Sequence, residues 1–416
     1  MTQATSTEAP VQFTGYQKFV LAILAFLQFT IILDFMIMSP LGAILMPALN
    51  ITPSQFGVVV SAYAFSAGIA GFLAAGFADR FDRKKLLMFF YCGFILGTFL
   101  CGIAPNFYFL LFARIVTGLF GGVIGSIVMA ITTDLFPFSM RGRVMGVLQT
   151  AFAGSQILGL PIGLFLSAHW GWHAPFMMIV GIAAIVGVII VMNLKPIDAH
   201  LQLHPDRSPF HHLKTTIATP RYLLAFAATG LLSIGGYMLM PFSSAFAVNN
   251  LGISMHDLPM IYLVTGLGAI VTGPMVGKLS DKFGKYRVFL FGAAMTIVMA
   301  VIYTRLGVTP LPIVILVNVL LFVGIFSRII PAQAMMSAVP TADSRGSFMA
   351  INSSLQQIAG GVGSVVAGMI VSQPAGGAIL HFDLLGDILV CTVLITAVMM
   401  YFIHRLVAVP ALVRTA

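Results

Sequence analysis

The sequence predicts an all-α polytopic membrane protein in which twelve transmembrane helices form two pseudo-symmetric six-helix bundles. The composition, the spacing of the apolar stretches and a repeat of short motifs predict this fold class. Of the 416 residues, 59% are hydrophobic and 8% are charged, so a soluble globule could not cover its apolar surface. The formal net charge of +9 would suggest nucleic acid in a soluble protein, but in a membrane protein the position of each charge matters more than the total. We therefore expect a lipid bilayer as partner and no nucleic acid.

A bilayer core about 30 Å thick needs roughly 20 apolar residues per helix, and the chain contains twelve such stretches between short polar breaks. In hydrocarbon a helix satisfies its own backbone hydrogen bonds, which an irregular crossing cannot do. The first apolar run is too long for a signal-peptide core, so we expect it to be retained. The predicted spans are 19–46, 55–77, 86–104, 107–134, 144–168, 173–194, 221–248, 258–279, 288–306, 310–338, 347–372 and 384–404.

The Lys and Arg residues of the short connections predict the orientation. If the N-terminus is cytoplasmic, nearly all of them lie on the inner side and only Arg305 lies on the outer side. We therefore expect both termini in the cytoplasm and the chain in the inner (plasma) membrane. A polar, proline-rich connection divides the chain into a cytoplasmic tail at 1–18, a six-helix half at 19–194, a cytoplasmic linker at 195–220, a second half at 221–405 and a cytoplasmic tail at 406–416.

The sequence contains no motif typical of metal binding or of nucleotide binding. Cys92, Cys101 and Cys391 stand far apart inside apolar runs, and their spacing is not typical of a metal site or a disulfide framework. The linker contains several histidines, but no Cys or carboxylate pattern completes a site. A phosphate-binding loop of the G-x-x-x-x-G-K-[ST] type does not occur, so an ion gradient is the expected energy source. We expect no cofactor, no metal and a monomer.

Two short motifs occur twice, at nearly the same offset of about 200 residues. Residues 75–84 read AGFADRFDRK, and residues 277–285 read GKLSDKFGK. The Arg-Gly pair that begins at Arg141 has a counterpart that begins at Arg345. This repeat predicts a duplicated six-helix unit, with the substrate site at the interface of the two halves near mid-membrane.

Both loops resemble the G-x-L-a-D-r-x-G-r-k signature of the major facilitator superfamily, and the resemblance covers the whole chain. The first copy has Ala75 and Asp82 where the signature has glycine, a departure that we expect to loosen the turn. The resemblance implies a cytoplasmic latch, in which the motif aspartate faces the start of the eleventh helix and the motif arginine pairs with an acid that closes the fourth. An acid at a helix end can meet the positive N-terminus of another helix. Alternatively, the cluster is only a topology signal. The latch residues are expected to be Asp79, Arg83, Asp134, Arg141 and Asp281.

Ionisable side chains at membrane depth are costly and therefore indicate function. Asp34 lies about 22 Å from the inner end of the first helix and Arg114 about 10 Å from the outer end of the fourth, so the two lie at similar depth. Residues 33–40 and 114–118 resemble the first- and fourth-helix motifs of the twelve-helix drug:proton antiporters. Burial favours the neutral acid and a neighbouring arginine favours the carboxylate, and this competition allows Asp34 to exchange a proton. A static buried pair and direct substrate binding by either residue are the alternatives.

Arg328 is the third charge at membrane depth. It lies about 25 Å from the outer end of the tenth helix, below Asp34, and no acidic residue shares its depth. Arg328 either supports carbonyl groups freed by Pro331 or snorkels, or it faces the cavity and contacts an anionic or polar group of the substrate.

Small residues and soft side chains indicate where the helices pack and where a substrate binds. Glycines and a proline of the fifth helix resemble the glycine-proline motif of exporters, although simple close packing explains them as well. The many Phe, Tyr and Met side chains suit an adaptable pocket for an apolar compound. The helix-packing and bending candidates are Gly154, Gly159, Pro161 and Gly163. The cavity candidates, selected by depth and helix number, are Arg328, Phe35, Met38, Tyr237, Met240 and Asn352.

The expected function is secondary active transport, with proton-coupled efflux of small amphipathic molecules by alternating access of the two halves. The alternative is a specific transporter of a sugar or an organic anion, by export or uptake. A membrane-embedded enzyme or a receptor is a weaker alternative, because an enzyme needs a second titratable group or a metal near Asp34. A channel is disfavoured because the sequence has no filter motif.

Overall fold

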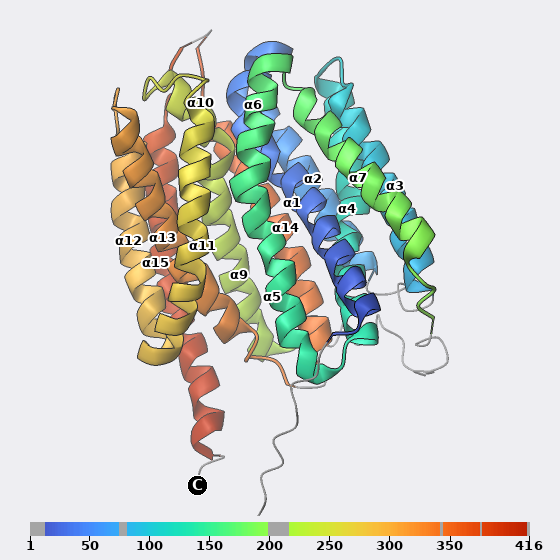
Figure 1. Ribbon diagram of the computed structural model, residues 1–416. Coiled ribbons are helices and arrows are strands. Elements are labelled where there is room, and N and C mark those ends of the chain that lie inside the picture. The colour runs from blue at the N-terminus through green and yellow to red at the C-terminus, as the bar shows by residue number, and fades with distance from the viewer. Residues whose placement is uncertain (1–12, 75–80, 199–215, 342–343, 375–376, 414–416) are drawn as a thin grey trace, which may run out of the picture.

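The computed structural model describes residues 13–74, 81–198, 216–341, 344–374 and 377–413. The predicted all-α fold with twelve crossings in two halves is confirmed (Figure 1). The N-terminal half contains α1 Gly15–Leu49, α2 Pro53–Ala74, α3 Arg83–Gly102, α4 Phe107–Leu135, α5 Phe138–Gly154, α6 Leu160–Trp170 and α7 Ala174–Asn193. The C-terminal half contains α9 Pro220–Leu239, α10 Ser243–Asn249, α11 Leu258–Phe283, α12 Lys285–Thr304, α13 Leu311–Met336, α14 Arg345–Ile370 and α15 Phe382–Val413. Helices α5 and α6 form one crossing, as do α9 and α10.

Helix α1 begins and α15 ends at the same end of the bundle, drawn at the bottom of Figure 1. We call this the terminal end and the opposite one the far end. Helix α1 begins at Gly15 rather than at residue 19, because Thr14 caps it. The Thr14 hydroxyl accepts a hydrogen bond from the Gln17 backbone N–H (3.2 Å), and the Gln17 side chain accepts one from the Thr14 N–H (3.0 Å). This reciprocal capping box satisfies backbone donors that a helix start otherwise leaves without partners.

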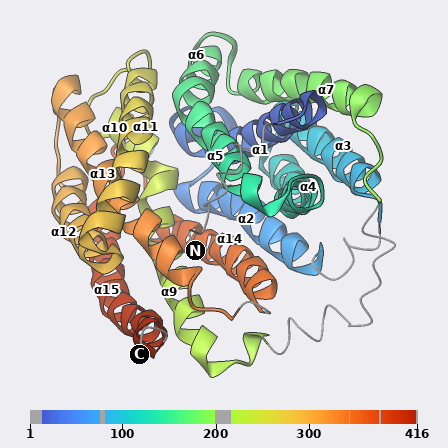
Figure 2. The same cartoon turned by 60° about the horizontal axis from the view of Figure 1, so that its bottom comes forward.

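Helix α14 is the most polar of the crossings. Eleven helices of the described chain are long and apolar enough to cross a membrane by composition alone, and α14 completes the twelve although it carries Asn352, Gln356 and Gln357. It packs along α2 of the other half and along α9 of its own half (Figure 2). A helix enclosed between other helices needs less apolar surface than one that faces lipid.

The two halves meet mainly where α2 packs on α14, α6 on α11 and α1 on α10. Small residues let these backbones approach closely: a Cβ added at Gly57 of α2 would lie 2.7 Å from the carbonyl oxygen of Ser364 of α14. Between α1 and α10, the Ser244 hydroxyl donates a hydrogen bond of 3.0 Å to the Ser39 carbonyl oxygen. The Ser39 hydroxyl in turn donates to the carbonyl oxygen of Met240. The far-end part of α1 is therefore bound to the seventh crossing.

The fifth crossing changes geometry at the contact between the halves. A π-helical turn at Ser155–Gly159 separates α5 from α6, and Pro161 stands near the start of α6. Proline has no backbone N–H and its ring disturbs the preceding turn, so the wide turn accommodates it. The same turn contacts α11, where a Cβ added at Gly266 would lie 3.0 Å from Cγ1 of Ile157.

Candidate functional site

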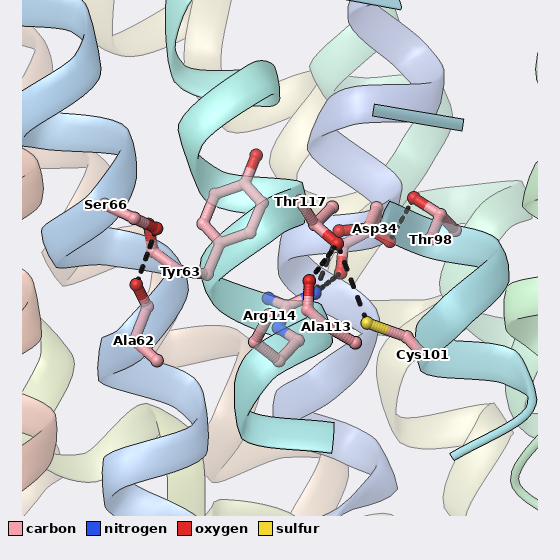
Figure 3. Close-up of polar contacts among 9 residues, drawn as sticks. All are labelled: Asp34, Ala62, Tyr63, Ser66, Thr98, Cys101, Ala113, Arg114 and Thr117. Carbon is pink, nitrogen blue, oxygen red and sulfur yellow. Dashed lines mark hydrogen bonds and ion pairs between the residues drawn. The ribbon is translucent and has the colours of Figure 1, made fainter. Parts of the chain in front are cut away.

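Asp34 of α1 and Arg114 of α4 form an ion pair inside the N-terminal half (Figure 3). The Arg114 Nη1 atom lies 2.9 Å from Asp34 Oδ2, and both side chains are 0% exposed. The second carboxylate oxygen, Oδ1, accepts a hydrogen bond of 3.0 Å from the Thr98 hydroxyl of α3. Both carboxylate oxygens therefore have a donor, which offsets part of the cost of burying the charge.

The other side of the Arg114 guanidinium faces an aromatic ring. Its Cζ atom lies 4.6 Å from the centroid of the Tyr63 ring of α2, a distance at which the ring face attracts a cation. The Arg114 Nε and Nη2 atoms have no hydrogen-bond partner among the described residues. The Cys101 sulfur lies close by, 3.7 Å from the Thr117 hydroxyl (Figure 3). Arg114 thus lies between a carboxylate and an aromatic face.

Glycines bring the helices of this site together. A Cβ added at Gly118 of α4 would lie 2.5 Å from the carbonyl oxygen of Tyr63. One added at Gly97 of α3 would lie 2.7 Å from the backbone nitrogen of Thr117. Helix α4 can therefore approach both α2 and α3 closely only because these positions lack a side chain, and that approach places Arg114 beside Tyr63 and Thr98.

The predicted glycines of the fifth crossing pack on α1 around Asp34. A Cβ added at Gly159 would lie 2.5 Å from a methyl of Leu33, and one added at Gly163 would lie 2.6 Å from a methyl of Ile37. Gly154 lies opposite the ring of Phe29, at 3.6 Å from its added Cβ. The fifth crossing therefore holds the α1 segment that carries the acid.

Arg328 of α13 is buried, and none of the described acidic residues forms an ion pair with it. Its side chain belongs to a residue that is 3% exposed, and its Nε and Nη2 atoms have no hydrogen-bond partner in the described part of the chain. Helix α13 continues through Pro331. Unpaired charge at this depth is more costly than the neutralised pair at Asp34.

The structure brings together some of the predicted cavity residues and separates others. Phe35 and Tyr237 are in contact, with ring centroids 5.9 Å apart. Met38 is fully buried, whereas Met240 lies in the turn between α9 and α10. The side-chain oxygen of Asn352 accepts a hydrogen bond of 2.6 Å from the Thr229 hydroxyl of α9.

The latch residues are described only in part. Arg83 Nε lies 3.1 Å from Asp134 Oδ2, which joins the start of α3 to the end of α4. Asp79 lies outside the described residues, and so does the side chain of Arg141. Asp281 is exposed and pairs within its own half with Lys285, at 3.5 Å.

Asp82, which stands where the signature has glycine, links the start of α3 to the first residues of the predicted linker. Its Oδ1 atom accepts a hydrogen bond of 2.9 Å from the Lys85 N–H and caps α3. Its Oδ2 atom accepts a bond of 3.2 Å from the Ile197 N–H, and the Arg83 N–H donates to the Ile197 carbonyl oxygen at 3.0 Å. The Asp82 side chain therefore binds the backbone just after α7, at Ile197.

Sequence reasoning missed Tyr63, Thr98 and the role of Asp82. Tyr63 and Thr98 are neutral residues in apolar helices, so charge and hydropathy do not single them out. Gly118 and Gly122, four residues apart on α4, are the signal that could have indicated a close crossing with a neighbouring helix.

Comparison with known proteins agrees with this architecture. The MFS-type transporter YceJ of Bacillus subtilis (strain 168) is 27% identical over 352 residues, covering 82% of this chain and 86% of that protein. Multidrug resistance protein 2 of the same organism is 28% identical over 278 residues, covering 65% of this chain and 69% of that protein.

Solved structures show the same fold. A bacterial homologue of the human lysosomal transporter Spinster, in an inward-facing and unoccupied conformation, superposes with a TM-score of 0.71 at 16% identity, covering 95% of this chain and 98% of that one. The peptide transporter POT in complex with alafosfalin gives a TM-score of 0.74 at 13% identity, covering 96% and 97%.

The profile of the Major Facilitator Superfamily matches residues 24–364 and 225–412, and so includes both halves. With its twelve crossings in two related bundles, the chain is a multi-pass membrane transporter and belongs to the Major Facilitator Superfamily.

Proposed function

We propose that this transporter couples proton movement to the efflux of small amphipathic molecules by alternating access of its two halves. The observation that carries the proposal is the Asp34–Arg114 pair, because Asp34 is the only buried acidic residue in the described part of the chain. A titratable group at this depth is costly unless it has a function. Relatives that are named multidrug resistance proteins support the substrate class and the direction.

Burial and Arg114 have opposite effects on the protonation of Asp34, and this opposition couples proton movement to transport in our proposal. While the Arg114 pair and the Thr98 hydrogen bond are intact, the carboxylate is favoured. If the pair opens, burial favours the neutral acid and Asp34 takes up a proton; when the pair forms again, the proton leaves. Because the same helix is bound to the seventh crossing through Ser39 and Ser244, rocking of the halves moves the segment that carries the acid.

We also propose an orientation in the membrane and a cytoplasmic latch between the halves. We place the terminal end in the cytoplasm, with the chain in the inner membrane as a monomer, because the basic connections cluster at that end. The Arg83–Asp134 pair, together with Asp79, Arg141 and Asp281, forms the cytoplasmic latch in this proposal. Unchanged transport by a normally expressed Asp79→Asn variant would argue against the latch.

The test uses proteoliposomes with an imposed pH gradient and three fluorescent or labelled probes: cationic ethidium, neutral chloramphenicol and anionic fluorescein. We expect wild type to accumulate at least one probe against its gradient. Asp34→Asn is expected to lose this accumulation but to keep equilibration down a gradient. Asp383→Asn, which removes an exposed acid outside both the ion pair and the latch, is the matched control and is expected to behave as wild type. Proton-driven accumulation by Asp34→Asn at the wild-type rate would refute the coupling role.

Arg328 favours a second candidate, transport of an organic anion. A buried guanidinium with two unpartnered nitrogens offers donors to a carboxylate, a phosphate or another polar oxygen of a substrate. If this candidate holds, Arg328→Gln loses transport of fluorescein and keeps transport of chloramphenicol. Equal loss for both probes would instead indicate a role in supporting the helix next to Pro331.

A further inference from the structure

A row of three aromatic rings connects the Asp34–Arg114 pair to the C-terminal half. Starting from the Arg114 guanidinium, the Tyr63 ring lies 4.6 Å away. The Tyr63 and Phe35 ring centroids are 5.2 Å apart, and those of Phe35 and Tyr237 are 5.9 Å apart. We call Tyr63, Phe35 and Tyr237 the aromatic row. It begins in α2 and α1 and ends in α9, on the other side of the interface between the halves.

The N-terminal end of the row is fixed to the helix that carries Arg114. A Cβ added at Gly118 would lie 2.5 Å from the Tyr63 carbonyl oxygen, and one added at Gly121 would lie 2.8 Å from the Tyr63 hydroxyl. Tyr63 itself is 2% exposed. With so little space between α2 and α4, Tyr63 and Arg114 cannot separate without moving the helices.

The other end of the row is fixed to the C-terminal half. A Cβ added at Gly360 of α14 would lie 2.9 Å from Cδ2 of Tyr237, so the Tyr237 ring lies directly on the α14 backbone. Phe35 follows Asp34 in α1 and belongs to the N-terminal half. The contact between Phe35 and Tyr237 is therefore the point of the row at which the two halves meet.

Arg114 has two attractive partners in this arrangement, the Asp34 carboxylate and the Tyr63 ring. Its Nε and Nη2 atoms have no other partner among the described residues. A change in the charge of Asp34 therefore alters how strongly the guanidinium is attracted to the Tyr63 ring. A cation over an aromatic ring is held more strongly when water is excluded. Once a proton neutralises Asp34, the Tyr63 face becomes the main remaining partner of the guanidinium.

We propose that Tyr63 and Phe35 are positioning residues that transmit the protonation of Asp34 to the joint between the halves at Tyr237. The inference rests on the proposed proton coupling. The guanidinium shifts from the carboxylate toward the Tyr63 ring, the ring presses on Phe35, and the packing of Phe35 on Tyr237 changes. Among the described residues, the titratable groups that interact with Arg114 besides Asp34 are Tyr63 of α2 and Cys101 of α3, and Tyr237 of α9 interacts with Tyr63.

The test measures the distance between the halves with protons as the only ligand. Spin labels are placed by cysteine substitution at Tyr108 and Val308, which are 77% and 88% exposed near the far ends of α4 and α12. The exposed Cys92 and Cys391 are replaced by serine, and the buried Cys101 is kept. Distances are measured by double electron–electron resonance in the full-length protein, in lipid nanodiscs, at acidic and at alkaline pH.

Five variants in this labelled background distinguish loss of a ring from loss of folding. Asp34→Asn removes the acid that takes up the proton. Tyr63→Leu removes the ring and Tyr63→Phe keeps it. Phe35→Leu breaks the row at its next member. Phe65→Leu is the matched control, because Phe65 is another ring of α2 at the interface, opposite Gly361 of α14, where an added Cβ would lie 3.0 Å from it. Thermal unfolding of each variant confirms that it is assembled.

We expect the wild-type distance populations to change with pH, and Tyr63→Phe and Phe65→Leu to show the same change. In Tyr63→Leu and Phe35→Leu we expect the pH-dependent change in the population ratio to shrink by about tenfold, the scale of a desolvated cation–π contact. A wild-type response in Tyr63→Leu, with none in Asp34→Asn, would overturn the inference and leave the proton coupling in place. A wild-type response in Asp34→Asn, or a wild type that does not respond to pH, would overturn both.

Discussion

Replacement of Gly118 by alanine tests whether the close crossing of α4 and α2 positions the ion pair. The added Cβ would lie 2.5 Å from the carbonyl oxygen and 2.9 Å from Cα of Tyr63, and closer still to the Ser66 hydroxyl. Non-bonded heavy atoms prefer separations of about 3.5–4.0 Å. The backbone of Tyr63 cannot rotate away as a flexible side chain can, so the two helices must move apart by about 1 Å.

That separation has consequences for both stability and transport. Overpacking a tight contact costs about 1–3 kcal/mol, so we expect a lower midpoint of thermal unfolding. The same movement carries Tyr63 away from Arg114, whose Cζ atom now lies 4.6 Å from its ring. Since about 1.4 kcal/mol corresponds to a factor of ten, we expect proton-driven transport by Gly118→Ala to fall by about tenfold or more.

The chain provides a matched control on the same helix. A Cβ added at Gly125 of α4 would have no heavy atom within 4 Å, and alanine favours a helix over glycine by about 1 kcal/mol. Gly125→Ala is therefore expected to transport as wild type and to unfold at the same or a higher temperature. Both variants are assayed in proteoliposomes and by unfolding in detergent. If Gly118→Ala matches Gly125→Ala in both measurements, the positioning role of the crossing is refuted.

Two further substitutions test the hydrogen bonds of individual side chains. Thr98→Val removes the hydroxyl that donates a hydrogen bond to Asp34 at 3.0 Å. Because a hydrogen bond to a charged group contributes about 1.5–3 kcal/mol, we expect proton-driven transport to fall by about tenfold or more. Thr98→Ser, which keeps the hydroxyl, is expected to restore it. Asp82→Ala removes the cap of α3 and the acceptor of the Ile197 N–H. We expect the free energy of unfolding to fall by about 1–2 kcal/mol and hydrogen exchange at the Ile197 amide to become faster. An unchanged exchange rate would contradict the assigned contact.

The pairing of Asp34 with Arg114 follows from depth along two helices, and this is why sequence alone could suggest it. Helices rise by 1.5 Å per residue, so counting from alternating ends places charges at a membrane level without knowledge of side-chain rotation. The same arithmetic cannot show which helices are neighbours or which faces they present. Thr98 and Tyr63 complete the site through such neighbour relations, and their own helices give no polar signal.

Helix α14 shows why hydropathy and three-dimensional position have to be considered together. Its predicted span, 347–372, agrees closely with the observed Arg345–Ile370, although its polar side chains keep it below the composition typical of a crossing. The Asn352 side chain bonds to Thr229 of α9 at 2.6 Å, so it does not face lipid with an open polar group. The polarity that weakens the sequence signal thus marks a helix between the halves.

The two halves differ in how their buried charges are paired, although matches to one family model include both of them. By the order of crossings, α13 is the counterpart of α4, and each carries an arginine inside the bundle. Arg114 is neutralised by Asp34 at 2.9 Å, whereas Arg328 has no acidic partner in the described residues. Proton exchange needs a buried acid whose counter-charge can be withdrawn, and among the described residues only the N-terminal half has such a pair. A substrate anion needs a buried cation without an acidic partner, and within the same residues only the C-terminal half has one, Arg328. Under the proposed function, proton coupling therefore belongs to the N-terminal half and binding of any substrate anion to the C-terminal half. In that proposal the aromatic row between α1 and α9 is the contact through which the two sites influence each other.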